Sequence, residues 1–307
     1  MKKKIFNQVT VRVPGSTSNC GAGFDTLGLA LTIYNNVTLT RGDWRGARAA
    51  TDADAAGLNM ADEAAQLFFV RAGVEEFGFT LKIDGDVPMS RGLGSSVTLR
   101  AGVVAALNDL SGAGLTRDDL CSLVTQLEGH PDNATPAVLG GFCVARCHPH
   151  TGELLGVLRK PIGRDLTFVV VSPDQELETK KARGILPKEL PYFDAIKSVN
   201  SAAYVVAAMV SGEYDRLRDA VCDFLHEPYR LPLIPGAKSA IEAGVTAGAL
   251  TGWLSGSGSS VLCVSRPRVA AKVGRAMAAA FAAHKLPSTI HVLTADNKGL
   301  TLGKRRI

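Results

Sequence analysis

The apolar positions along the chain follow two repeats, one typical of strands and one typical of helices. Alternation of apolar and polar residues predicts strands at 9–13, 29–39, 79–83, 142–146, 166–172 and 289–293. Longer segments with few breakers predict helices at 62–77, 95–110, 116–126, 237–247 and 269–284, a helix-rich stretch at 193–226 and a strand–turn–strand unit at 249–265. Because the two kinds of segment alternate, we expect a layered α/β or α+β fold rather than a helix bundle or a sandwich.

A turn-rich segment at 161–165 divides this pattern into two parts. We therefore predict an N-terminal domain over residues 1–162 and a C-terminal domain over residues 163–307. The length of 307 residues is sufficient for two ordinary domains, each with its own apolar core.

Composition and charge exclude several classes of protein. Hydrophobic residues make up 46% of the chain and charged residues 21%, as in ordinary globular proteins, so disordered, collagen-like and disulfide-scaffold classes are excluded. The net charge of +5 comes largely from residues 2–4 and 304–306. Charge at the two ends is typical of solvated tails and does not form the basic face of a nucleic-acid-binding protein, so we expect no nucleic-acid partner.

No apolar stretch approaches the ~20 residues that a membrane-spanning helix needs. Lysines 2–4 are not followed by the apolar segment of a secretory signal, because Asn7, Gln8 and Thr10 interrupt it. Six scattered cysteines favour reduced thiols. We therefore expect a cytoplasmic protein without a membrane partner.

The ten residues Val87-Pro-Met-Ser-Arg-Gly-Leu-Gly-Ser-Ser96 connect a predicted strand to a predicted helix. Two glycines would let the backbone approach an anion, while the helix start offers unpaired N–H groups and a positive dipole. These residues alone leave two interpretations open, a phosphate site and an ordinary capped turn. The lysine of a Walker A loop and the third glycine of a dinucleotide fingerprint are both absent.

Two further motifs follow the glycine–serine loop in the chain. They are Glu128-Gly-His-Pro-Asp-Asn133 and Leu254-Ser-Gly-Ser-Gly258. In this order the three motifs resemble those of the GHMP family of small-molecule kinases. The resemblance implies a two-domain α+β fold, with an N-terminal domain like ribosomal protein S5 and a ferredoxin-like C-terminal domain. It also implies ATP as co-substrate and Mg²⁺ as cofactor, and it is compatible with a homodimer, because such small kinases often pair.

The resemblance assigns the glycine–serine loop to ATP. The implied ATP-binding residues are Pro88, Arg91, Gly92, Leu93, Gly94, Ser95, Ser96, Val97 and Thr98. Ser96 and Glu128 are the implied ligands of Mg²⁺. From the sequence alone, Glu128 could equally be an exposed acid at a helix end. The motif at 254–258 is expected to pack against the nucleotide site, although a plain hairpin turn also explains its glycines.

Three other segments, at 13–28, 179–183 and 226–230, resemble the members of the family that phosphorylate the amino acid L-homoserine to O-phospho-L-homoserine. A zwitterion with a hydroxyl needs an anion for its ammonium and a guanidinium for its carboxylate. The resemblance implies the substrate-binding residues Asn19, Asp25, His130, Asn133, Thr179, Arg183 and Arg230. Without it, Asp25 would be a turn-capping carboxylate, and the arginines would be ordinary surface side chains.

The implied catalytic residues are Asn133 and Arg183, which would orient the substrate hydroxyl. An asparagine amide cannot accept a proton at neutral pH, so the sequence offers no obvious general base. A phosphate oxygen or water would then take the proton.

Residues 97–100, Val-Thr-Leu-Arg, depart from the small residues that the family usually has after its serines. Arg100 would lie one turn beyond Ser96, where the helix dipole disfavours a cation unless an anion is near. We therefore expect Arg100 either to act through ATP or to extend into solvent. Two other functions stay open: another GHMP kinase, for mevalonate or a sugar, and a nucleotide-binding regulator that has lost its chemistry through the changes at 97–100.

A zinc site at Cys143, Cys147, His148 and His150 is not supported. The two cysteines are four residues apart on a predicted strand, roughly 13 Å at the strand rise, which is too far for one metal.

Overall fold

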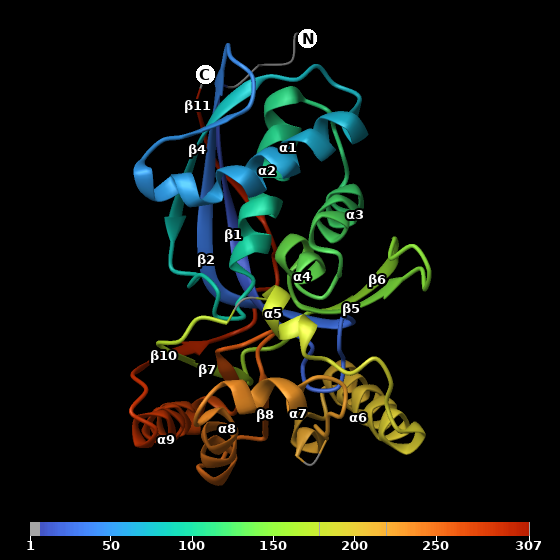
Figure 1. Cartoon of the computed structure of the whole chain (residues 1–307), viewed down its shortest axis with the longest axis vertical. Coiled ribbons are helices and arrows are strands. Elements are labelled where there is room, and N and C mark those ends of the chain that lie inside the picture. Colours follow the sequence, from blue (N-terminus) through green and yellow to red (C-terminus); the bar gives the residue numbers. More distant parts are fainter. Residues whose placement is uncertain (1–6, 178, 219, 307) are drawn as a thin grey trace.

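The computed structural model describes residues 7–177, 179–218 and 220–306, and at 179, 180 and 304–306 it describes the backbone only. Figure 1 shows two parts stacked along the long axis, each with its own sheet and helices. The predicted two-domain α+β fold is confirmed. No helix in the described part of the chain is both long and apolar enough to cross a membrane.

The first sheet has seven strands built around a long antiparallel pair, β1 (Gln8–Ser18) and β2 (Leu27–Gly42). The other strands are β3 (Ala47–Ala49), β4 (Gly78–Gly85), β5 (Phe142–Cys147), β6 (Leu154–Lys160) and β11 (Thr301–Arg306). β11 pairs with β1, so the last strand of the chain returns to the first sheet. The boundary between residues 162 and 163 stays a prediction, and this pairing places 301–306 with the N-terminal part.

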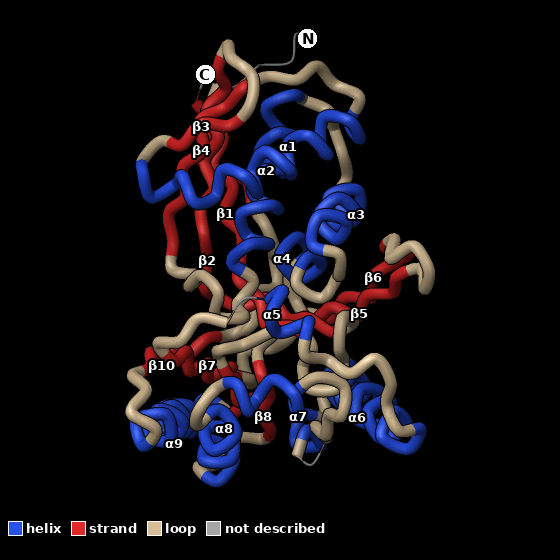
Figure 2. The backbone as a smooth tube through the Cα atoms, viewed as in Figure 1, coloured by secondary structure: helices blue, strands red, loops and turns tan. Residues whose placement is uncertain are grey.

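Helices cover one face of this sheet (Figures 1 and 2). They are the 3₁₀ turn η1 (Asp52–Gly57), α1 (Leu58–Ala72), α2 (Ser95–Ser111), α3 (Arg117–Glu128) and α4 (Ala134–Leu139). α2 is apolar around most of its circumference because it lies between the sheet and the other helices, and Val103, Val104 and Leu107 are fully buried. Its first turn, which follows the glycine–serine loop, is thereby held in place by the core.

The second sheet has the order β10–β7–β9–β8. Its strands are β7 (Thr167–Pro173), β8 (Thr251–Leu254), β9 (Val261–Ser265) and β10 (Ser288–Leu293). The accompanying helices are α5 (Thr179–Gly184), α6 (Tyr192–Ser211), α7 (Glu227–Arg230), α8 (Ala237–Thr246) and α9 (Ala270–Ala283), with short 3₁₀ turns η2 (Tyr214–Leu217), η3 (Leu231–Leu233) and η4 (Pro267–Val269). One apolar cluster joins the two sheets, since Leu29 and Leu31 of β2 share it with Phe168 and Trp253.

One predicted helix was wrong in extent. The helix predicted at 62–77 is α1, which begins at Leu58 and ends where Gly73 adopts a left-handed φ of 62°. The helix-rich stretch predicted at 193–226 contains α6, which ends before Gly212, and the turn η2. The pattern missed short elements such as α4, α5, α7 and β6, because four to seven residues carry too little periodicity.

Candidate functional site

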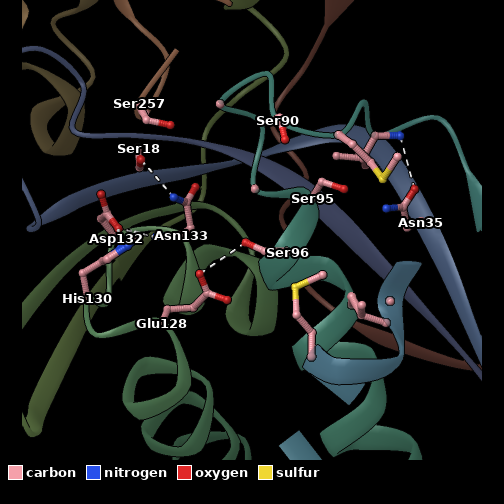
Figure 3. A pocket seen from close by; sticks show the side chains of 18 of the residues that line it. Ser18, Asn35, Ser90, Ser95, Ser96, Glu128, His130, Asp132, Asn133 and Ser257 are labelled. Atoms are coloured by element: carbon pink, nitrogen blue, oxygen red, sulfur yellow. Dashed lines mark hydrogen bonds and ion pairs between the residues drawn. The ribbon is translucent and has the colours of Figure 1, made fainter. Parts of the chain in front are cut away.

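A cavity of about 450 Å³ lies where the two parts of the molecule meet. Its walls come from β1 and the turn after it, from η1, from the loop and first turn of α2, from residues 128–133, and from α5, α7 and the turn after β8. Figure 3 shows polar side chains of β1, of the loop and first turn of α2, of residues 128–133 and of the turn after β8 around the same space. One end is polar, whereas the other is lined by apolar residues that include Met60, Ile83, Val87 and Leu99.

The glycine–serine loop borders the cavity and needs its glycines. Gly92 and Gly94 have φ angles of 72° and 71°, and a Cβ on Gly92 would lie 2.0 Å from the carbonyl oxygen of Ser255. The hydroxyl of Ser255 donates to the Gly92 carbonyl at 2.7 Å. The turn after β8 therefore packs against this loop, as its motif led us to expect.

The loop residues divide into those at the cavity and those behind it. Gly92, Gly94, Ser95 and Ser96 line the cavity, at the N-terminus of a 17-residue helix. Backbone N–H groups and a helix dipole at such a position favour an anion. The other residues assigned to ATP do not line the cavity: Pro88, Arg91, Leu93, Val97 and Thr98. Leu93, Val97 and Thr98 are buried beneath the loop, and Arg91 pairs with Asp174.

Ser96 and Glu128 lie together although 32 residues separate them. The Ser96 hydroxyl donates to Glu128 Oε2 at 3.3 Å (Figure 3). Glu128 ends α3, and only 7% of its side chain is exposed. A hydroxyl and a carboxylate at the edge of an anion site are hard oxygen donors of the kind that Mg²⁺ prefers, so these residues fit the ion.

Asn133 is held between two serines of β1. Its Oδ1 accepts from Ser16 at 2.8 Å and its Nδ2 donates to Ser18 at 3.0 Å. Together these two bonds hold the Asn133 amide against β1. The position next to it, Asp132, is buried and pairs with His130 Nδ1 at 2.6 Å.

His130 and Asp132 each stabilise the charged form of the other. Burial alone would raise the pKa of Asp132, but the hydrogen bond and charge of His130 lower the pKa below its ordinary value. Burial likewise opposes the charged form of His130, yet Asp132 raises the pKa of His130 above its ordinary value. Asp132 is therefore a carboxylate at neutral pH and a poor proton acceptor.

Asn19 and Asp25 shape the turn between β1 and β2. Both have left-handed backbone, with φ angles of 67° and 53°, as asparagine and aspartate tolerate. Asn19 is buried, accepts from the Asp25 N–H at 3.1 Å and donates to the Gly256 carbonyl at 3.1 Å. Its amide is therefore occupied by the backbone, while Asp25 faces the cavity and pairs with Arg183 through both oxygens, at 2.6 and 3.0 Å.

Arg230 is a buried cation at the polar end of the cavity, with 2% of its surface exposed. Its Nε donates to the Ala182 carbonyl at 3.1 Å and its Nη1 to the Gly256 carbonyl at 3.3 Å. In the described part of the chain, Arg230 forms no ion pair with a carboxylate. Burial and the nearby Arg183 charge lower the pKa of Arg230 to about 10, so an anionic ligand here would relieve an unfavourable charge.

The cavity thus brings together Asn19, Asp25, His130, Asn133, Arg183 and Arg230. Thr179 begins α5, and its side chain lies outside the described residues. Ser18, Phe24 and Asp132 also line the cavity, but they were not among the predicted site residues. The guanidinium groups of Arg183 and Arg230 both lie over the Phe24 ring, 5.3 and 5.1 Å from its centre. Phe24 belongs to the Gly-Phe-Asp sequence at 23–25, and its place beside Asp25 was the sequence signal that could have identified it as a site residue.

An anion cradle at a helix start, a pair of oxygen donors beside it and a polar pocket next to both define a small-molecule kinase. Models of the GHMP kinase N-terminal and C-terminal domains match residues 59–141 and 205–283, together more than half of the chain. The chain belongs to the GHMP kinase family, which confirms the resemblance seen in its motifs.

Relatives extend this match over nearly the whole chain. Homoserine kinases from Moorella thermoacetica and Microchaete diplosiphon are each 37% identical to it, over 94% and 96% of this chain and 98% and 97% of theirs. The crystal structure of homoserine kinase from Cytophaga hutchinsonii has a TM-score of 0.88 at 28% identity, and the match covers 99% of both chains. The mevalonate kinase of L. major shares the fold, with a TM-score of 0.68 at 18% identity over 97% of this chain and 99% of its own.

Proposed function

We propose that this chain is a homoserine kinase, which transfers the γ-phosphoryl group of ATP to the hydroxyl of L-homoserine and releases O-phospho-L-homoserine and ADP. This reaction belongs to threonine biosynthesis. The observation that carries the proposal is Arg230, a buried guanidinium that lines the cavity and has no carboxylate partner among the residues that the structure describes. An α-carboxylate on the substrate supplies that partner. Mevalonate carries its carboxylate at a different position relative to the phosphorylated hydroxyl, and galactose has no carboxylate.

The acceptor end of the cavity suits a zwitterion. The Asp25 carboxylate binds the substrate ammonium, and Arg183 and Arg230 bind the carboxylate. In the free protein Asp25 and Arg183 neutralise each other at 2.6 Å. Substrate binding exchanges this one ion pair for two, so both charged ends are needed for tight binding.

ATP occupies the opposite end. Its phosphates bind the backbone N–H groups at Gly92–Ser96, and its base enters the apolar region around Met60 and Val87. Ser96 and Glu128 would hold Mg²⁺, which would supply positive charge against the phosphates. Of the loop residues behind the cavity, Leu93, Val97 and Thr98 act by holding the loop in place.

Phosphoryl transfer to the hydroxyl depends mainly on positioning and on charge. Asn133, fixed by Ser16 and Ser18, and Arg183 orient the hydroxyl toward the phosphate. Asp132 is committed to His130, so the hydroxyl proton passes to a phosphate oxygen or to water rather than to this carboxylate. We also propose that the enzyme works in the cytoplasm as a homodimer.

A coupled assay of ADP release tests the substrate assignment. We expect Mg-ATP turnover with L-homoserine and background rates with mevalonate and galactose. Turnover of mevalonate or galactose alone would assign the chain to another branch of the family. No release of ADP with any of the three would favour a regulator.

A further inference from the structure

Arg100 is the most unusual side chain near the cavity. It lies on α2 one turn after Ser96, and 16% of its side chain is exposed. Its Nη1 donates to Glu128 Oε1 at 2.7 Å and its Nη2 to Glu63 Oε2 at 3.0 Å. Arg100 therefore does not extend into solvent, as one of our expectations had it, but joins α1 to the end of α3.

The position is unfavourable for a cation without these partners. A positive charge near the start of a helix opposes the helix dipole, and the Nε of Arg100 is buried with no partner among the described residues. The buried Glu128 compensates for the dipole, whereas Glu63 is 62% exposed and contributes less. The Arg100 charge therefore acts mainly on Glu128.

The two carboxylate oxygens of Glu128 accept hydrogen bonds from different residues. Oε1 accepts from Arg100 at 2.7 Å, and Oε2 accepts from Ser96 at 3.3 Å. Arg100 therefore fixes the rotation of the carboxylate so that its second oxygen is presented beside the glycine–serine loop. It also places a positive charge against the carboxylate that would bind a divalent cation.

We propose that Arg100 is a positioning residue for the metal ligand Glu128. Arg100 orients the Glu128 carboxylate for catalysis and weakens the affinity of the site for the divalent ion. This inference rests on the proposed function, in which Ser96 and Glu128 hold Mg²⁺. Repulsion between a unit charge and a divalent ion on opposite oxygens of one carboxylate exceeds the gain from holding that carboxylate still. Removing the charge therefore strengthens metal binding while reducing turnover.

The test measures Mn²⁺ binding to the full chain in the presence of ADP, by electron paramagnetic resonance of free Mn²⁺, together with kcat at saturating Mg²⁺. We expect Arg100→Met to tighten Mn²⁺ binding at least about fivefold, and to lower kcat about tenfold because Glu128 is no longer held. Arg100→Lys keeps the charge but loses the planar fork. Its Mn²⁺ affinity should stay within about twofold of the parent protein, while its kcat falls as in Arg100→Met.

Two controls separate charge and folding from position. Arg71→Met removes the same charge from an exposed site on α1 and should change neither quantity. Glu63→Gln removes the outer partner of Arg100 and should weaken Mn²⁺ binding about two- to threefold, the direction opposite to Arg100→Met. This variant retains the Arg100–Glu128 pair, so it is informative even if Arg100→Met folds poorly.

Glu128→Gln tells the two proposals apart. If it weakens Mn²⁺ binding and Arg100→Met behaves like Arg71→Met, the metal site stands and the role of Arg100 is wrong. If Glu128→Gln leaves Mn²⁺ affinity unchanged, the metal site itself is wrong, and the role of Arg100 is overturned with it.

Discussion

Replacement of Arg230 by methionine isolates the carboxylate contact of the acceptor site. Methionine retains much of the apolar stem but has no charge and no donor. A hydrogen bond to a charged group contributes about 1.5–3 kcal/mol, which corresponds to roughly a 10- to 150-fold loss of binding. The KM for L-homoserine should rise within this range, and the KM for ATP should change less than about twofold, because the phosphate site is built from Gly92–Ser96.

The variant also removes hydrogen bonds from the carbonyls of Ala182 and Gly256. The Gly256 carbonyl keeps its hydrogen bond from Asn19, but the Ala182 carbonyl loses the Arg230 donor. An unsatisfied carbonyl costs about 1–3 kcal/mol of stability, so the melting temperature must be recorded beside the kinetics. The decisive comparison is the ratio of the two KM changes at a temperature where the variant is folded. Equal rises for homoserine and ATP would refute the assignment of Arg230 to the substrate carboxylate.

Three further predictions concern the other parts of the site. Glu128→Gln should lower kcat at least about tenfold, and excess Mg²⁺ should recover part of the loss, because a metal ligand is weakened rather than removed. Steady-state assays across a Mg²⁺ series test this, and unchanged activity at limiting Mg²⁺ would contradict it. The raised pKa of His130 means that its pair with Asp132 stabilises the fold fully below the ordinary histidine pKa of 6.5 and loses this contribution as the pH rises through the folded-state pKa. Urea unfolding should therefore show a loss of stability above about pH 6.5 that is smaller in His130→Gln, and identical pH profiles would exclude the ion pair. Gly92→Ala should abolish measurable ATP binding in calorimetry, because its Cβ would lie 2.0 Å from the Ser255 carbonyl, and unchanged affinity would show that the loop can move aside.

Local signals predicted the elements that carry strong caps or long apolar faces. The predicted helix at 116–126 corresponds to α3, where Thr116 and Asp119 form a capping box. The start of α1 was missed because the 3₁₀ turn η1 leads directly into it, and no cap residue marks Leu58. The strand β11 was missed because its pairing partner, β1, lies almost 300 residues earlier in the chain.

In the site, too, local sequence predicted some features, and long-range packing decided the others. The motifs placed Gly92, Ser96 and Glu128 in one region, because each lies at the end of a helix or in a loop of recognisable sequence. The partners of Arg100 could not be predicted, since the rotation of α2 relative to α1 and α3 depends on core packing rather than on any local pattern. The commitment of Asp132 to His130 was likewise visible only in three dimensions.

The most direct test of the central claim is a competition experiment with product identification. The full chain is incubated with Mg-ATP and equal concentrations of L-homoserine, mevalonate and galactose, and phosphorylated products are identified by mass spectrometry and ³¹P nuclear magnetic resonance. The account predicts O-phospho-L-homoserine as the dominant product, formed in equal amount to ADP. A phosphorylated product of mevalonate or galactose in excess over O-phospho-L-homoserine would contradict it.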